Sequence, residues 1–219
     1  MGDGMMVKIC GIANREDALA AIDGGAAALG FNFYAASPRY VAPDDAAEIA
    51  SGLPAGVWKV GVFVNESPKA VLRTAIRVGL DIVQLHGKES PEQYPQGIRV
   101  WKAIRMLSKA GETACPTTAT AGVEAVLLDG PASGQVFDWA RVPQNIGRLI
   151  LAGGLDSENV QQAIEQVHPW GVDVSTGVES SPGKKDPSKI RAFVQAARAA
   201  EPEPYDPEDL EGPYDWQDE

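Results

Sequence analysis

The chain has 219 residues, of which 44% are hydrophobic and 22% are charged, so it can bury one sizeable core. Its formal net charge of −11 is uneven, because residues 201–219 hold nine of the 30 acidic residues and no lysine or arginine. This leaves the first 200 residues nearly neutral, which argues against a nucleic-acid-binding protein. No apolar run approaches the roughly 18 residues of a membrane helix, and Met1–Met6 lacks a signal-peptide pattern, so we expect a cytoplasmic protein.

Eight apolar runs of strand length recur along the chain, and most end in a polar or glycine-rich turn. They are Val7–Ile12, Ala27–Phe33, Trp58–Val64, Ile82–His86, Val100–Met106, Ala125–Asp129, Leu149–Ala152 and Gly171–Ser175. Segments with helical spacing alternate with them: Arg15–Asp23, Asp44–Leu53, Pro68–Val78, Ser157–Val167 and Pro187–Ala200. The segments Pro91–Pro95, Gly111–Thr120 and Trp139–Pro143 are short or poorly periodic, and we expect stunted helices or loops there.

This alternation predicts the α/β class and favours a (β/α)₈ TIM barrel over residues 1–200. An open doubly wound sheet stays possible, because a sequence does not show whether the first and last strands meet. Residues 201–219 form an acidic, proline-rich tail. Its aromatic residues Tyr205, Tyr214 and Trp216 leave a docking role open.

Polar residues share one face of three predicted strands, because alternate residues of a strand face opposite sides. The pairs are Lys8 with Cys10, Gln84 with His86, and Asp173 with Ser175. They face the barrel interior if the apolar residues between them, Val7, Ile9, Val83, Leu85, Val172 and Val174, face the helices. Cys10, His86, Asp129 and Ser175 would then ring one mouth, at the strand ends where such barrels place their chemistry.

Cys10 is the first candidate for chemistry, although a lone cysteine in a strand more often serves as a small hydrophobe. Gly11 follows it, and an ammonium at Lys8 would favour the thiolate. Cys115 lies in a loop-like stretch before a proline, and we interpret it as structural. Asp129 ends an apolar run, where a carboxylate is costly without partners. Its alternative role is to accept hydrogen bonds from loop amides.

Of the two histidines, His86 is inward-facing but can equally be structural, and His168 is interpreted as a helix cap or surface group. Gly153 with Gly154, and Ser175 with Gly177, follow the seventh and eighth strands, where such barrels bind phosphate through backbone amides. Tight turns that need glycine are the alternative. Arg39 in Ser37-Pro38-Arg39 could pair with a carboxylate or phosphate above the mouth, or be a solvated loop residue.

Several motifs occur in the order found in one family. They are Lys8-Ile9-Cys10-Gly11, Ser37-Pro38-Arg39, Gly61-Val62-Phe63-Val64, Gln84-Leu85-His86-Gly87, Ala152-Gly153-Gly154-Leu155, Ser175-Thr176-Gly177-Val178-Glu179 and Pro182-Gly183-Lys184-Lys185-Asp186. Over roughly residues 6–198 the chain resembles the phosphoribosylanthranilate isomerases of tryptophan biosynthesis, which are (β/α)₈ barrels. The likeness breaks at Gly130–Gln135, which leaves the conformation of that loop open, and the acidic tail has no counterpart in the family core.

The resemblance implies that Cys10 is the general base, Asp129 the general acid and Arg39 a substrate anchor, with phosphate at Gly153, Gly154, Ser175 and Gly177. Gln84, His86 and Asp173 are further candidates for substrate binding. The implied Amadori rearrangement needs a protonated acid beside an ionised thiol, so we expect Lys8 to lower the pKa of Cys10 and an apolar mouth to raise that of Asp129. No metal or organic cofactor is required, and we expect a monomer or a homodimer.

Three other functions stay open. A histidine-pathway aminoaldose isomerase would share the fold and the phosphate site, but it uses an aspartate where this chain has Cys10. A metal-dependent epimerase needs several inward histidines, whereas only His86 qualifies. A non-catalytic phospholigand-binding barrel would keep the glycine loops without the pair of Cys10 and Asp129.

Overall fold

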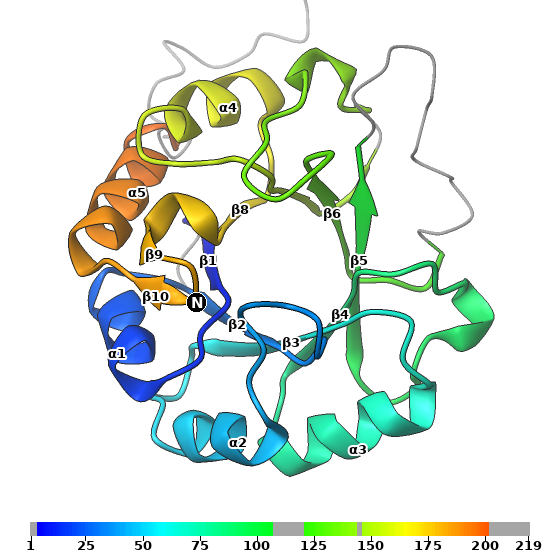
Figure 1. Cartoon of the computed structure of the whole chain (residues 1–219). Helices are drawn as coiled ribbons and strands as arrows, with labels where there is room; N and C mark the ends of the chain where they lie inside the picture. The colour runs from blue at the N-terminus through cyan, green and yellow to red at the C-terminus, as the bar shows by residue number, and fades with distance from the viewer. Residues whose placement is uncertain (1–3, 107–120, 144–145, 202–219) are drawn as a thin grey trace, which may run out of the picture.

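The computed structural model describes residues 4–106, 121–143 and 146–201. Eight parallel strands form a closed barrel in sequence order, with β8 pairing back onto β1 (Figure 1). The strands are β1 (Met6–Cys10), β2 (Ala28–Asn32), β3 (Trp58–Phe63), β4 (Ile82–Leu85), β5 (Arg99–Arg105), β6 (Ala125–Asp129), β7 (Leu149–Leu151) and β8 (Gly171–Val174). Outside them lie α1 (Arg15–Asp23), α2 (Pro43–Ser51), α3 (Pro68–Val78), α4 (Val160–Val167) and α5 (Pro187–Ala199). The predicted barrel is confirmed, and the open sheet is excluded.

The predicted strands all exist, and their ends differ from the prediction by two residues or fewer. The poorly periodic segments contain only single-turn 3₁₀ helices, η1 (Pro91–Gln93) and η3 (Trp139–Arg141), whereas Gly111–Thr120 lies outside the described residues. Sequence analysis missed η4 (Thr176–Val178) and a small antiparallel hairpin of β9 (Glu179–Ser181) and β10 (Lys184–Lys185). Within the described residues no helix is both long and apolar enough to cross a membrane.

Local capping explains where several helices begin and end. Asn14, Ser67 and Asp186 accept hydrogen bonds from amides in the first turns of α1, α3 and α5, respectively. The last two of these helices also start with proline, whose fixed φ suits the first helical position. His168 ends α4 in the left-handed region with φ 49°, as the predicted helix cap.

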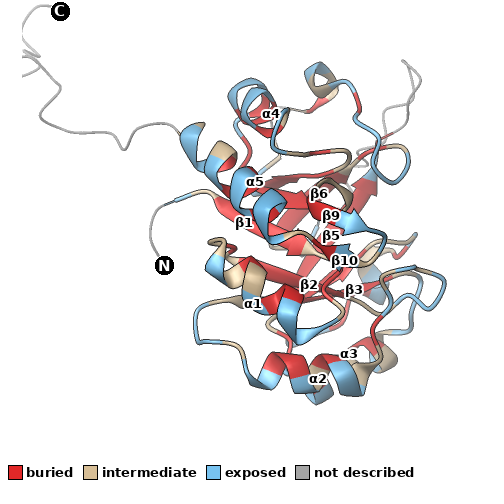
Figure 2. Cartoon of the chain, turned by 60° about the vertical axis from the view of Figure 1, so that its left-hand side comes forward, coloured by how far each residue is buried: buried red, intermediate tan, exposed pale blue. Residues whose placement is uncertain are grey.

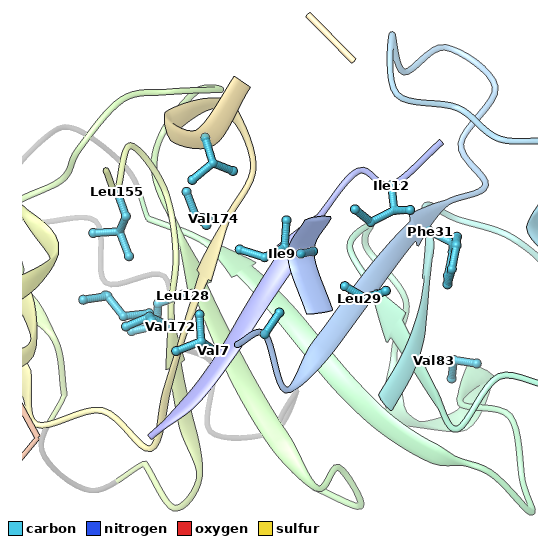
Figure 3. Close-up of a cluster of buried hydrophobic side chains, with 14 of the residues drawn as sticks. Val7, Ile9, Ile12, Leu29, Phe31, Val83, Leu128, Leu155, Val172 and Val174 are labelled. Carbon is cyan, nitrogen blue, oxygen red and sulfur yellow. The ribbon is translucent and has the colours of Figure 1, made fainter. Parts of the chain in front are cut away.

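Two apolar cores lie on the two sides of the strand ring. The larger one fills the space between strands and helices and includes the predicted outward residues Val7, Ile9, Val83, Leu85, Val172 and Val174. All of these except Leu85 are labelled in Figure 3. The smaller one fills the barrel interior with residues such as Ala28, Val60 and Leu127. Strands are accordingly buried on both faces, whereas the helices bury one face and expose the other (Figure 2).

Three tryptophans, Trp58, Trp101 and Trp170, fill the barrel at the amino ends of the strands. Their ring centroids lie 6.0–6.1 Å apart. Arg99 lies 4.5 Å above the Trp58 ring and Arg148 lies 5.2 Å above the Trp170 ring. Glu124 accepts hydrogen bonds from both arginines. This end of the barrel is therefore closed, and access to the interior is from the other end.

Residues 202–219 of the predicted tail lie outside the described residues. Because eight strands close the barrel without them, deleting 202–219 is expected to leave the melting temperature unchanged within a few degrees. The first tail residue, Glu201, should be kept because its carboxylate accepts a 2.7 Å hydrogen bond from the Met5 amide. Thermal denaturation and solution mass test this. A larger fall in melting temperature or a changed oligomeric mass would instead support docking of the tail aromatics.

Candidate active site

A cavity of about 920 Å³ opens at the carboxyl ends of the strands. Nine of the ten predicted site residues line it: Cys10, Arg39, Gln84, His86, Asp129, Gly153, Gly154, Asp173 and Ser175. Gly177 does not line the cavity. It lies in η4, where a Cβ atom would collide with the Leu155 carbonyl oxygen, so its lack of a side chain lets η4 pack against the loop after β7.

Lys8 and Asp173 form an ion pair inside the barrel. They are register partners on β1 and β8, and Lys8 Nζ donates a 2.9 Å hydrogen bond to Asp173 Oδ1. The Lys8 side chain is wholly buried, and 10% of the Asp173 side chain is exposed. Although burial acts to lower the pKa of Lys8, the carboxylate of Asp173 raises it above the ordinary value, so the ammonium stays charged.

Cys10 lies two residues beyond Lys8 at the end of β1. Room for its thiol comes from Gly30 of β2, where a Cβ atom would lie 2.7 Å from Cys10 Sγ and 3.0 Å from Lys8 Nζ. Burial raises the pKa of the Cys10 thiol, and Lys8 opposes this without overcoming it. The expectation that Lys8 lowers this pKa below its ordinary value is therefore wrong. The physical reason is that burial of the thiol, which is the largest effect, and the negative charge of Asp173 both disfavour the thiolate and together outweigh Lys8.

Asp129 ends β6 between two polar partners rather than in apolar surroundings. His86 Nε2 lies 3.1 Å from Asp129 Oδ2, and the Gly130 amide donates a 2.9 Å hydrogen bond to Oδ1. Gln84 Nε2 lies 3.3 Å from His86 Nδ1. Since an amide nitrogen can only donate, Nδ1 accepts, and a neutral imidazole then donates from Nε2 to Asp129. Gln84 Nε2 and both ring nitrogens of His86 thus contact protein groups and orient the Asp129 carboxylate, whereas Gln84 Oε1 is buried without a hydrogen-bond partner among the described residues.

A second buried ion pair shapes the loop that follows His86. Lys102 Nζ donates to Glu89 Oε2 at 2.9 Å, and to the carbonyl oxygens of Leu85 and Gly87 at 3.1 and 2.7 Å. Glu89 in turn accepts hydrogen bonds from the amides of Asn65 and Gly87. The backbone on both sides of His86 is therefore held by Lys102.

The glycines after β7 pack against the loop after β6. Gly153 and Gly154 have φ angles of 85° and 68°, which side chains rarely adopt. A Cβ atom on Gly153 would collide with the Gly130 amide, and one on Gly154 would lie 2.5 Å from the Val136 amide. The loop whose conformation the sequence left open thus folds back at Gly130–Gln135 onto these glycines. The positive φ angles and the close packing confirm the tight-turn interpretation of these glycines, and phosphate binding by their amides stays a prediction.

Arg39 is not a solvated loop residue, because it pairs with Glu179 of the unpredicted hairpin through two hydrogen bonds of 2.7 Å. Lys185 Nζ donates to the same carboxylate at 3.0 Å. Sequence analysis also missed Arg105, which lines the cavity at the end of β5. The alternation used for the other strands would have found it, because Trp101 and Ala103 of β5 face the interior. The residues Glu89, Lys102, Glu179 and Lys185 carry no such local signal.

The described residues contain no group of three histidine, cysteine, aspartate or glutamate side chains that could hold a metal ion. The polar groups of the cavity are instead thiol, carboxyl, imidazole and guanidinium groups, which can transfer protons or bind anions.

Comparison with known proteins shows the family of this chain. Residues 7–196 match the family model for N-(5'-phosphoribosyl)anthranilate isomerase. A relative of that name from Solibacter usitatus is 46% identical over 202 residues, which cover 90% of this chain and 98% of the relative.

Solved structures agree with this match. A dimeric phosphoribosylanthranilate isomerase from Thermotoga maritima, solved as engineered monomers, is 42% identical with a TM-score of 0.79, covering 89% of this chain and 99% of its own. A phosphoribosylanthranilate isomerase in complex with reduced 1-(o-carboxyphenylamino)-1-deoxyribulose 5-phosphate is 40% identical with a TM-score of 0.76 over the same shares of the two chains. The chain therefore belongs to the N-(5'-phosphoribosyl)anthranilate isomerase family.

Proposed function

We propose that this chain catalyses the Amadori rearrangement of N-(5-phosphoribosyl)anthranilate to 1-(2-carboxyphenylamino)-1-deoxyribulose 5-phosphate, a step of tryptophan biosynthesis. The observation that carries this is the pair of Cys10 and Asp129, which end β1 and β6 and face one cavity in a chain of this family. A thiol and a carboxyl group at one barrel mouth suit a reaction with one proton donated and one removed. A barrel that only binds phospholigands would not need them.

In the proposed mechanism Asp129 protonates the ring oxygen, the bond from that oxygen to the first sugar carbon breaks, and the nitrogen lone pair forms an iminium ion. Cys10, as thiolate, then removes the proton from the second sugar carbon, and its electron pair neutralises the iminium ion to give an enolamine. Proton gain at the first carbon and proton loss from the second hydroxyl convert the enolamine to the ketone.

The two proton transfers of one turnover change the protonation states of Cys10 and Asp129, and these must be restored. After one turnover Cys10 holds a proton and Asp129 has lost one, so the next turnover needs these protonation states reversed. Because burial already raises the pKa of Cys10, the thiol is its resting form. The thiolate therefore forms within the catalytic cycle, and Lys8 is the cation that lies ready to stabilise it.

The substrate carries a phosphate at one end and an aromatic carboxylate at the other. We assign the phosphate to the loops with Gly153, Gly154, Ser175 and Gly177, because the first three line the cavity and small residues let an anion approach the backbone amides. Arg39 is assigned to the carboxylate. Since Gln84, His86 and Asp173 contact protein groups, we assign them to orienting Asp129 and Lys8 as well as lining the cavity.

We also propose where the protein is located and how it assembles. A biosynthetic enzyme that acts on a small phosphorylated metabolite is proposed to be cytoplasmic. Homodimerisation is as compatible with the barrel as a monomeric state.

Replacing either member of the catalytic pair tests the mechanism. Cys10→Ala and Asp129→Asn are each expected to lower kcat by about 10²-fold or more, the usual effect of removing a positioned acid or base. Loss of substrate fluorescence measures turnover, and circular dichroism confirms that the variants fold. A variant that keeps most of its turnover would remove that residue from the mechanism.

The raised pKa of Cys10 predicts how its alkylation depends on pH. In a Cys115→Ser background, the rate of reaction with iodoacetamide should rise with a midpoint above about 8.5, the ordinary thiol value, because only the thiolate reacts. Alkylation of Cys10 should abolish turnover. Bound reduced 1-(o-carboxyphenylamino)-1-deoxyribulose 5-phosphate should protect Cys10 from alkylation. A midpoint below the ordinary value would show that Lys8 outweighs burial after all.

The glycine loops predict competition by inorganic phosphate. Gly154→Leu should raise KM more than it lowers kcat, because crowded amides weaken the substrate and the transition state alike. Gly97→Leu is the matched control, since Gly97 has a similar φ of 82° but lies before β5, with nothing within 4 Å of an added Cβ atom. Equal effects of the two substitutions on KM, or phosphate bound away from these loops, would contradict the assignment.

A further inference from the structure

Glu179 holds the guanidinium group of Arg39 by one edge. Glu179 Oε1 accepts a hydrogen bond from Arg39 Nε and Oε2 accepts one from Nη2, each at 2.7 Å. Only 14% of the Arg39 side chain and 6% of the Glu179 side chain are exposed. Gly11 gives the arginine stem its place beside Cys10, because a Cβ atom there would lie 2.6 Å from Arg39 Cδ. The pair is therefore rigid, and it lies next to the proposed base.

This contact leaves the second edge of the guanidinium free. A guanidinium has five N–H donors, and Glu179 uses two of them. No other acceptor for the Arg39 side chain occurs in the part of the chain that the structure describes, and Arg39 lines the cavity. The edge formed by Nη1 and Nη2 has the geometry to bind a further carboxylate through two hydrogen bonds.

Lys185 fixes Glu179 from the other side. Its ammonium is wholly buried and donates to Glu179 Oε1 at 3.0 Å and to the Ser175 carbonyl oxygen at 3.1 Å. The Lys189 ammonium holds the Glu179 carbonyl oxygen at 2.8 Å. Lys185 thus ties the Glu179 carboxylate to the loop after β8, and Lys189 ties the Glu179 backbone to α5, so Glu179 is held independently of Arg39.

The charges of this cluster do not balance. Among the described residues Glu179 is the only carboxylate that forms an ion pair with Lys185 or Arg39, so two basic side chains share one negative charge, and the guanidinium of Arg39 faces the cavity. A pair with only a structural role would need no third ion, because burying an extra charge costs free energy. The surplus charge favours an anionic ligand at the free edge.

We propose that Glu179 is a positioning residue that aims the free edge of Arg39 at the aromatic carboxylate of the substrate, with Lys185 holding Glu179 in place. This rests on the proposed function, which gives Arg39 that carboxylate. Glu179 itself does not touch the substrate.

Two ligands that differ only in the carboxylate test the proposal. One is reduced 1-(o-carboxyphenylamino)-1-deoxyribulose 5-phosphate, and the other is the same compound built on aniline. Glu179→Gln should raise the Kd of the carboxylated ligand about tenfold and leave that of the aniline ligand within twofold. In turnover, KM should rise about tenfold, with kcat changed less than threefold. Equal weakening of both ligands, or of neither, would overturn the proposal.

Glu124→Gln is the matched control, because Glu124 also binds two cations, Arg99 and Arg148, at the opposite end of the barrel. Glu124→Gln should lower the melting temperature about as much as Glu179→Gln does, but it should leave the Kd of both ligands unchanged. If Glu179→Gln does not fold, Glu179→Asp keeps the charge but shortens the side chain, and it should weaken only the carboxylated ligand.

Arg39→Ala distinguishes the proposed binding role of Arg39 from the proposed positioning role of Glu179. If it weakens both ligands equally, the assignment of Arg39 to the carboxylate fails. If it weakens only the carboxylated ligand while Glu179→Gln changes nothing, that assignment stands and the positioning role of Glu179 is refuted.

Discussion

The buried ion pair of Lys8 and Asp173 is the constraint on which the site depends. It joins the first and last strands inside the barrel, where the Lys8 side chain is wholly buried and only 10% of the Asp173 side chain is exposed. Removing one partner would leave the other buried and unpaired, at a cost of about 3–5 kcal/mol. Burial has the largest effect on the pKa of Cys10, and the two members of this pair act on it in opposite directions, since Lys8 favours the thiolate and Asp173 disfavours it.

Two further buried ion pairs hold the loops around the opening of the cavity. Lys102 with Glu89 fixes the backbone around His86, and Glu179 with Lys185 fixes Arg39. Most of these charges are matched by a partner within the protein, so they organise the site without attracting a ligand. The positive charge of Arg39 is different, because its free edge faces the cavity and is the group that we propose binds the substrate carboxylate.

Much of the fold could be predicted because each strand carries its own signal. On β1, β4 and β8, apolar residues that face the helices alternate with residues that face the barrel interior. A polar or glycine-rich turn marks most strand ends. The hairpin of β9 and β10 had no such signal. Its strands are three and two residues long, and most of their side chains are polar, so their burial depends on contacts with distant residues such as Arg39 and Asp17.

The sequence by itself determined that Cys10 and Asp129 lie at the ends of strands, because strand length and alternation are local properties of the chain, whereas closure of the strands into a barrel is shown by the pairing of β1 with β8. Only the tertiary structure decided the partners of the ionisable groups. Lys8 is 165 residues from Asp173, and Arg39 is 140 residues from Glu179. Burial and Coulomb interaction depend on distances in space, so the raised pKa of Cys10 and the fixed edge of Arg39 arise only when the barrel closes.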